Sequence, residues 1–130
     1  MKQQTLTKSE MQVMNILWEI GHSACVADVL ERYQEPKPAY TTVATFLKIL
    51  EQKGFVEHRK GKGKLLMYSP LMTKERYSRQ VMEEVKDNFF DGSFSSLVSF
   101  FAQSEKLSEE ELDEIAAIIR SLQQQKEKEA

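Results

Sequence analysis

The sequence predicts a mostly α protein with one small β-hairpin, divided into an N-terminal region, residues 1–72, and a C-terminal helical region, residues 73–130. Three observations support this prediction. Apolar residues recur at helical spacing along most of the chain, two short extended runs separated by glycines lie near its middle, and the net charge changes sign between the two regions.

The charge is distributed unevenly. Residues 1–72 carry ten Lys and Arg against seven Asp and Glu, whereas residues 73–130 carry eight against thirteen. The net charges are therefore +3 and −5. The whole chain is slightly acidic, with a pI of about 5.8, so the asymmetry rather than the total indicates a polyanionic partner for the N-terminal region.

The composition also predicts the compartment. No apolar run approaches the roughly 20 residues that span a bilayer, and the start MKQQTLTKSE lacks the apolar core of a signal peptide. A single cysteine, Cys25, excludes an intrachain disulfide and fits a reducing environment. We therefore expect a cytoplasmic protein without membrane insertion.

Two helices are expected first. Thr7 and Glu10 form a capping box, in which each side chain can bond the other residue's amide, and Gly21 stops the helix that follows. Pro36 and Pro38 end the second helix, because proline removes a donor and disfavours helix in the residue before it. The apolar stripes of the two helices are Val13, Ile16, Leu17 and Ile20, and then Val26, Val29, Leu30 and Tyr33.

A third helix and a hairpin occupy the stretch AYTTVATFLKILEQKGFVEHRKGKGKLLMYSP, residues 39–70. A threonine is expected as the N-cap of the helix, and Lys53-Gly54 is a C-terminal stop signal. Two extended runs, residues 55–60 and 64–69, are joined by a loop with two glycines, which is typical of a hairpin. The stripe of the helix is Val43, Phe46, Leu47 and Leu50.

A helix followed at once by a hairpin with a basic tip is the second half of a winged helix-turn-helix, in which the helix enters the DNA major groove. Threonines and a lysine lie opposite the apolar stripe, and residues 37–64 hold seven cations against Glu51 and Glu57. Threonines on a helix and lysines on a hairpin edge can also be ordinary surface, but together they favour double-stranded DNA. The predicted contact residues are Tyr40, Thr41, Thr42, Thr45, Lys48, Arg59, Lys60, Lys62 and Lys64.

The C-terminal region offers three apolar stripes in 58 residues, residues 73–130. A unit of this size without a disulfide or a metal buries too little surface to be comfortably stable alone, so we expect it to pair with a second copy. The alternative is that it folds back on its own N-terminal region. The predicted dimerisation residues are Leu97, Phe100, Phe101, Leu112, Ile115, Ile119 and Leu122.

Enzymatic functions are disfavoured. His22, His58 and Cys25 are the only candidates for base, nucleophile or soft metal ligand, and they fall on separate predicted elements. The run Gly61-Lys62-Gly63 lacks the spacing of a phosphate-binding loop. We expect no catalytic residue, metal or cofactor. The alternative function is a winged helix that contacts another protein without specific DNA binding.

Four strings of the sequence resemble one known family, the penicillinase-repressor (BlaI/MecI/CopY) family of bacterial transcriptional repressors. They are LTKSEMQVMNILWEIG, the 39–70 stretch quoted above, GSFSSLVSFF and LSEEELDEI, and the match runs from about Leu6 to Leu122. The resemblance implies a winged-helix homodimer on an operator of inverted half-sites. It also implies that Thr41, Thr42, Thr45 and Lys48 occupy DNA-contacting positions.

The resemblance further implies a mode of control. In β-lactam-responsive members, a membrane-bound sensor metalloprotease leads to cleavage within the short helix before the last one, and this position corresponds to the Phe100–Phe101 bond. Two residues depart from the family pattern, since Ile49 stands where members usually have arginine and Phe100 replaces an asparagine. The chain lacks the paired C-terminal cysteines of the copper-responsive branch, so we reject copper control.

Overall fold

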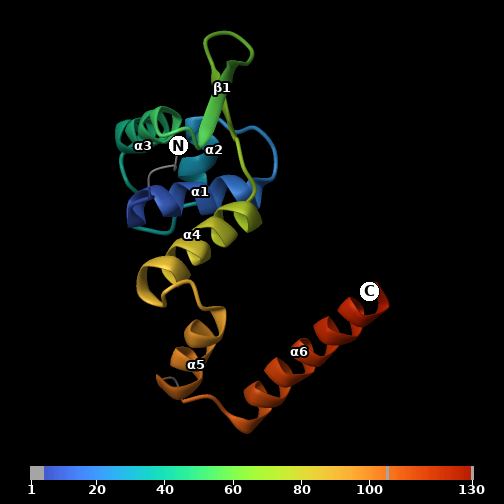
Figure 1. Cartoon of the computed structure of the whole chain (residues 1–130). Coiled ribbons are helices and arrows are strands. Elements are labelled where there is room, and N and C mark those ends of the chain that lie inside the picture. The colour runs from blue at the N-terminus through green and yellow to red at the C-terminus, as the bar shows by residue number, and fades with distance from the viewer. Residues whose placement is uncertain (1–4, 105, 130) are drawn as a thin grey trace. The chain divides into compact units, whose positions relative to one another are not determined.

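The computed structural model describes residues 5–104 and 106–129. It confirms a mostly helical chain with one two-stranded antiparallel hairpin (Figure 1). The chain divides into two compact units, an N-terminal unit that ends at Val81 and a C-terminal unit that begins at Met82. In chain order the elements are α1 (Lys8–Ile20), α2 (Val26–Glu31), α3 (Tyr40–Gln52), β1 (Val56–Lys60), β2 (Leu66–Pro70), α4 (Lys74–Phe89), α5 (Phe94–Ser104) and α6 (Glu109–Glu129).

Helix α1 begins and ends as predicted. The Glu10 amide donates to Thr7 Oγ1 at 3.2 Å, and the Thr7 amide donates to Glu10 Oε1 at 2.9 Å, which completes the capping box. Gly21 takes a left-handed conformation, φ 79°, and closes the helix. Met14, which sequence periodicity placed off the centre of the apolar stripe, is fully buried in the core beside Val13 and Leu17.

The start of α3 differs from the prediction. Its N-cap is Ala39 rather than a threonine, and the Ala39 carbonyl accepts from the amides of Thr42 and Val43. Ala39 is extended, with φ −68° and ψ 150°, so the helix starts at Tyr40, and Thr41 and Thr42 fall within its first turn. Their hydroxyls are therefore not used as a cap and remain on the surface of the helix.

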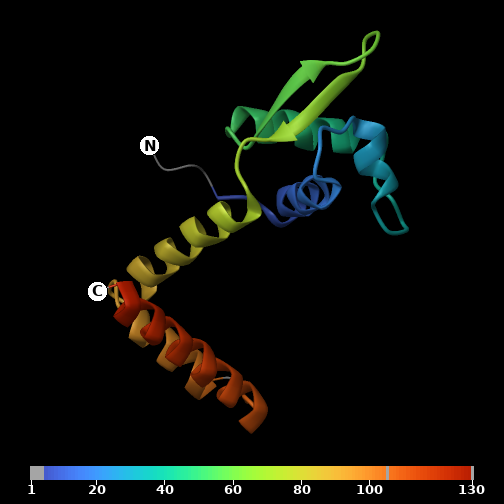
Figure 2. The same cartoon turned by 90° about the vertical axis from the view of Figure 1, so that its right-hand side faces the viewer.

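The hairpin follows α3 directly. Its antiparallel register runs from Val56 opposite Pro70 to Lys60 opposite Leu66. Both strands lie within two residues of the predicted runs at each end, which confirms the hairpin. Figure 2 shows that the strands extend beyond the helices of the N-terminal unit. The tip is closed by the Gly61 amide, which donates to the Leu65 carbonyl at 2.7 Å.

The first turns of α4 belong to the N-terminal unit. Tyr77 is buried there, with its ring edge-on to Phe55 at 5.4 Å, and its hydroxyl accepts from the Leu6 amide at 3.2 Å. Trp18 Nε1 donates to the Met72 carbonyl at 2.9 Å. The compact unit therefore extends to Val81, beyond the boundary expected after Met72, because the aromatic ring of Tyr77 completes its core.

In the C-terminal unit, α4 and α5 are separated by a break at Asp91 and Gly92, both of which have positive φ values. Leu97 of α5 is 3% exposed, and the rings of Phe90 and Phe100 lie 5.5 Å apart. None of the residues of α6, all of which the structure describes, is buried. Among the helices in the described ranges, none is both long and apolar enough to cross a membrane.

Candidate nucleic-acid interface

The outer face of α3 is polar and exposed. Thr41, Thr45 and Lys48 lie on this face, while the opposite face is fully buried in the core. The Thr45 hydroxyl donates to the Thr41 carbonyl at 2.9 Å, so it offers a partner its oxygen lone pairs and its methyl group. These groups suit an exposed base amine or a thymine methyl in a major groove.

The first turn of α3 also carries the predicted contact residues Tyr40 and Thr42. The Tyr40 side chain is 53% exposed. Thr42 is exposed at the edge of the face and lines a groove with Phe46 and with residues of α1. The exposed first turn places a helix N-terminus beside these side chains, and such a terminus favours a phosphate.

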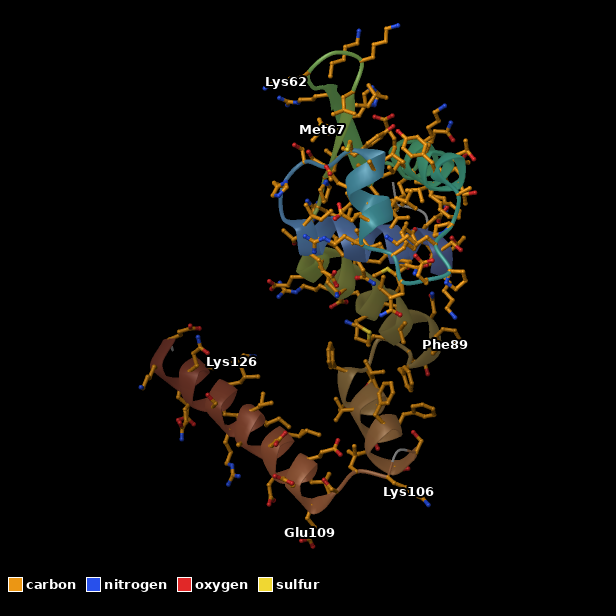
Figure 3. All side chains as sticks on the ribbon, turned by 180° about the vertical axis from the view of Figure 1, so that it is seen from behind. Lys62, Met67, Phe89, Lys106, Glu109 and Lys126 are labelled. Carbon is orange, nitrogen blue, oxygen red and sulfur yellow. The ribbon has the colours of Figure 1, made fainter. Side chains whose placement is uncertain are left out.

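The hairpin carries the remaining predicted cations. Arg59 and Lys60 lie on β1, and Lys62 and Lys64 lie in the loop at the tip; all four are exposed. Figure 3 labels Lys62 at this tip. The Arg59 guanidinium is 3.7 Å from the Glu57 carboxylate, but both side chains are largely exposed, so water screens the pair. The hairpin therefore presents a cluster of cations that are available to a polyanion.

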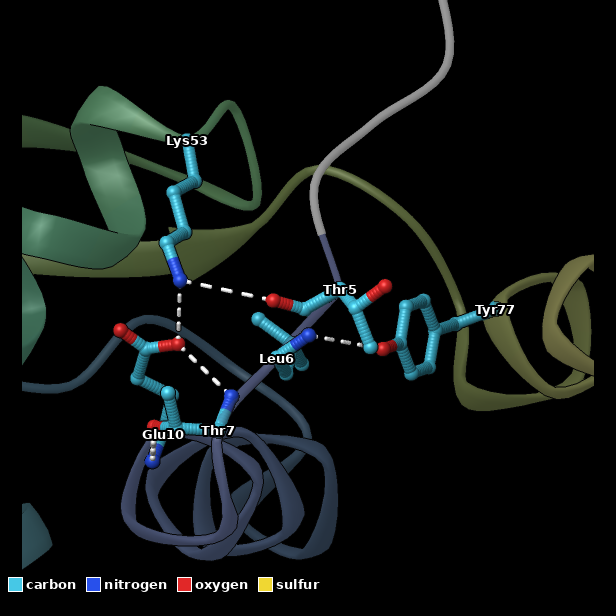
Figure 4. Close-up of polar contacts among 6 residues, drawn as sticks. All are labelled: Thr5, Leu6, Thr7, Glu10, Lys53 and Tyr77. Carbon is cyan, nitrogen blue, oxygen red and sulfur yellow. Dashed lines mark hydrogen bonds and ion pairs between the residues drawn. The ribbon is translucent and has the colours of Figure 1, made fainter.

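Lys53 is a correction to the predicted positive footprint. Its Nζ lies 2.6 Å from Glu10 Oε1, and the side chains of Lys53 and Glu10 are 16% and 5% exposed (Figure 4). Burial raises the pKa of Glu10, but the hydrogen bonds from Lys53 and Thr7 and the charge of Lys53 outweigh it, so the pKa lies below its ordinary value. Lys53 therefore joins α3 to α1 and is not free to contact a phosphate.

One feature of this surface was not predicted, a side-chain hydrogen bond between α3 and the hairpin. His58 Nδ1 of β1 lies 2.6 Å from Glu51 Oε2 of α3. The sequence showed one carboxylate and one histidine, but seven residues separate them across a turn, and no spacing rule predicts such a pair. The pair lies where the predicted contact surfaces of α3 and the hairpin meet.

The predicted dimerisation residues divide into two sets. Leu97 is buried within its own chain, so it supports α5 rather than the exposed surface. The other predicted residues are exposed, and Ile118 joins them at 59%. The exposed apolar residues of α5 and α6 are Phe94, Val98, Phe100, Phe101, Leu112, Ile115, Ile118, Ile119 and Leu122.

The candidate cleavage bond lies inside a helix. Phe100 and Phe101 are both exposed, and the Phe100 carbonyl accepts from the Ser104 hydroxyl at 2.6 Å. Proteases bind extended chains, so cleavage here requires local opening of α5. The side chains at the bond are accessible, whereas its backbone is held by the helix.

A helical body, a flanking hairpin and an exposed polar helix face bordered by cations define a winged-helix DNA-binding protein. Within this class of protein, the sequence identifies the family. The model of the penicillinase repressor family matches residues 6–121, and the chain belongs to this family. The family consists of transcriptional repressors, not enzymes.

Individual relatives cover nearly the whole chain. The methicillin resistance regulatory protein MecI of Staphylococcus aureus strain N315 is 29% identical over 115 residues, which is 88% of this chain and 92% of MecI. The penicillinase repressor of Bacillus licheniformis is 25% identical over 116 residues, which is 88% of each chain. The solution structure of monomeric Bacillus licheniformis BlaI with the blaP half-operator matches with 25% identity and a TM-score of 0.48, covering 58% of this chain and 92% of that one.

Proposed function

We propose that this repressor acts as a homodimer whose two N-terminal units bind the inverted half-sites of one DNA operator. Its family membership supplies the class of function. The exposed polar face of α3 and the cations of the hairpin support the DNA contact, through Tyr40, Thr41, Thr42, Thr45, Lys48, Arg59, Lys60, Lys62 and Lys64.

The main observation in favour of a dimer is the exposed apolar surface of α6. A helix of 21 residues with five aliphatic side chains between 38% and 59% exposed is not stable by itself in water. A second copy of the same surface would cover it, because a twofold interface joins one patch to itself. The dimer interface is formed by Phe100, Phe101, Leu112, Ile115, Ile119 and Leu122, with Leu97 supporting it from inside α5.

Pairing of the C-terminal units explains tight binding through avidity. Once one N-terminal unit is bound, the second half-site contact becomes intramolecular, which raises the affinity by about 10² to 10⁴. Loss of the pairing therefore releases the operator. In this proposal, induction separates the C-terminal units, and cleavage of the Phe100–Phe101 bond by a membrane sensor metalloprotease is one route to that state.

The test is a truncation after Phe90, which keeps the N-terminal unit and α4. Gel-shift titrations compare the full chain and the truncation on a duplex from the promoter upstream of its own gene and on a random duplex. Sedimentation measures the oligomeric state of both proteins. We expect a full-length dimer with strong preference for the promoter duplex, and a folded truncated monomer that binds it at least about 100-fold more weakly.

Two outcomes would contradict the proposal. A truncated monomer that binds as tightly as the full chain would exclude avidity. A full chain that binds promoter and random duplexes equally at low salt would exclude an operator-specific repressor and would favour the alternative, a winged helix that contacts another protein.

A further inference from the structure

The hairpin is held at its base from two sides. On one side, Tyr68 of β2 and Ala24 exchange two backbone hydrogen bonds of 2.7 and 2.9 Å, which fasten the hairpin to the segment before α2. On the other side, His58 of β1 reaches Glu51 of α3. Within the described part of the chain, this is the only side-chain hydrogen bond between α3 and the hairpin.

The two attachments are adjacent. His58 and Tyr68 are partners in the strand register, and their rings lie 5.7 Å apart. The His58 imidazole therefore contacts the buried Tyr68 ring on one side and the Glu51 carboxylate on the other. The orientation of the hairpin relative to α3 is therefore linked to the strength of the pair between His58 and Glu51.

The pair also controls charge at the interface. Glu51 is the only acidic residue of α3; it follows Lys48 by three residues, and its partner His58 is next to Arg59 on β1. A bare carboxylate there repels DNA phosphates, whereas a carboxylate paired with an imidazolium does not. Histidine is the side chain whose charge ordinarily changes between about pH 5 and pH 8.

Tyr68, whose ring lies beside that of His58, does not change charge in that range. Burial, and then the nearby Glu51 and Tyr40, raise the pKa of Tyr68 above its ordinary value, so its hydroxyl stays neutral. The strand neighbours of His58 on β1 are Glu57 and Arg59, which lie 3.7 Å from each other. Of the groups in this cluster, His58 is the one that bridges the hairpin to α3.

We infer that His58, held by Glu51, is a positioning residue that couples the hairpin to α3 and makes DNA binding take up a proton. This inference rests on the proposed DNA-binding function. The negative potential of the duplex favours the imidazolium form, and that form binds Glu51 most strongly and sets the hairpin for contact. Affinity for DNA therefore increases as the pH falls.

The experiment measures the dissociation constant of the full chain by fluorescence anisotropy at about pH 6 and about pH 8, at constant ionic strength. The probe is a labelled duplex from the promoter upstream of its own gene. For the wild type we expect binding about three- to tenfold tighter at the lower pH, as uptake of up to one proton allows. His58→Gln should remove this difference by weakening binding at the lower pH.

The chain supplies a matched control, because His22 is its only other histidine. His22 is exposed between α1 and α2, and its Nδ1 contacts the Ser23 carbonyl at 2.9 Å rather than α3 or the hairpin. His22→Gln should keep the full pH difference. Glu51→Gln should reduce the difference and, with the repelling carboxylate removed, should tighten binding at the higher pH. Circular dichroism confirms that each variant is folded.

The outcomes separate this inference from the proposed function. If the wild type prefers the promoter duplex but its affinity does not change with pH, or if His58→Gln keeps the same pH difference, the inference is wrong and the repressor proposal stands. If the wild type prefers the promoter duplex at neither pH, the proposed function itself fails.

Discussion

The ion pair between Glu10 and Lys53 shows how a single residue can serve a role opposite to the one its charge indicates. Lys53 lies at the end of the helix that is expected to face DNA, yet its Nζ is bound to Glu10 at 2.6 Å and also donates to the Thr5 carbonyl at 3.4 Å. A cation with little exposure and two acceptors stabilises the fold. The predicted cationic contacts with DNA are therefore Lys48 and the cations of the hairpin.

Glu10→Gln should therefore destabilise the protein. The Lys53 charge would lose its carboxylate, and we expect a loss of about 1 to 3 kcal/mol in the free energy of unfolding at neutral pH. Urea unfolding followed by circular dichroism measures it. Glu19→Gln, on an exposed position of the same helix, is the control and should change stability by less than about 0.5 kcal/mol.

The same pair predicts a dependence on pH. Because the pKa of Glu10 is lowered in the folded state, its contribution is fully present above the ordinary value of 4.5 and is lost as the pH falls through the folded pKa. The stability difference between wild type and Glu10→Gln should accordingly shrink on acidification below about pH 4.5. A difference that stays constant down to the acid-unfolding limit would contradict this assignment.

Substitutions of two residues at the predicted interface should distinguish contacts with DNA bases from contacts with the DNA backbone. Thr45→Ala removes an oxygen and a methyl group from the face of α3, so it should weaken binding to the promoter duplex by about five- to fiftyfold and leave random duplexes unchanged. Lys62→Ala removes a charge at the hairpin tip, so it should weaken all duplexes alike and reduce the salt slope by about 0.9.

Fluorescence anisotropy over a series of salt concentrations measures both effects. Lys126→Ala removes the same charge from the C-terminal unit and is the control for Lys62. A Lys62→Ala variant with the wild-type salt slope would show that the hairpin tip does not contact the DNA backbone.

At the scale of elements, local chemistry accounts for what could be predicted from sequence. The capping box of Thr7 and Glu10, the left-handed Gly21 and the glycines of the hairpin act within a few residues, so their patterns are readable. The missed features arise from tertiary contact. No local pattern predicts the pairing of His58 with Glu51 or the packing of Tyr77 in the core of the N-terminal unit.

The start of α3 lies between these cases. A threonine is a better N-cap than alanine, but Ala39 has the extended conformation of an N-cap and the helix begins at Tyr40. The individual contact residues of the interface remain predictions, because exposure of a side chain shows that it is available and not what it touches.

Helix α6 makes a prediction at this scale. A double variant, Ile115→Glu with Ile119→Glu, places charges within the apolar stripe and should weaken self-association at least about 30-fold, as expected when interface residues worth about 2 kcal/mol are lost. Sedimentation equilibrium measures it. Ala117→Glu, about 160° around the helix from each of those two positions at 100° per residue, is the control and should leave association unchanged.

At the scale of the whole molecule, two compact units predict unfolding in two steps. The N-terminal unit has its own core and should melt at a temperature that is independent of protein concentration. In the proposed dimer the C-terminal unit depends on its partner copy, so the temperature of its transition should rise as the protein concentration increases. Calorimetry at two concentrations differing about tenfold measures both steps. A single transition that does not move with concentration would exclude this organisation.

Helix α4 is shared by the two units, since Lys74–Phe89 runs across the junction between Val81 and Met82. One added residue in an α-helix turns everything beyond it by about 100°. An insertion or deletion within α4 would therefore turn the residues after it by that angle relative to the residues before it. In the proposed dimer, a residue added to or removed from α4 would rotate one unit against the other, so we expect relatives with a different α4 length to bind half-sites at a different spacing.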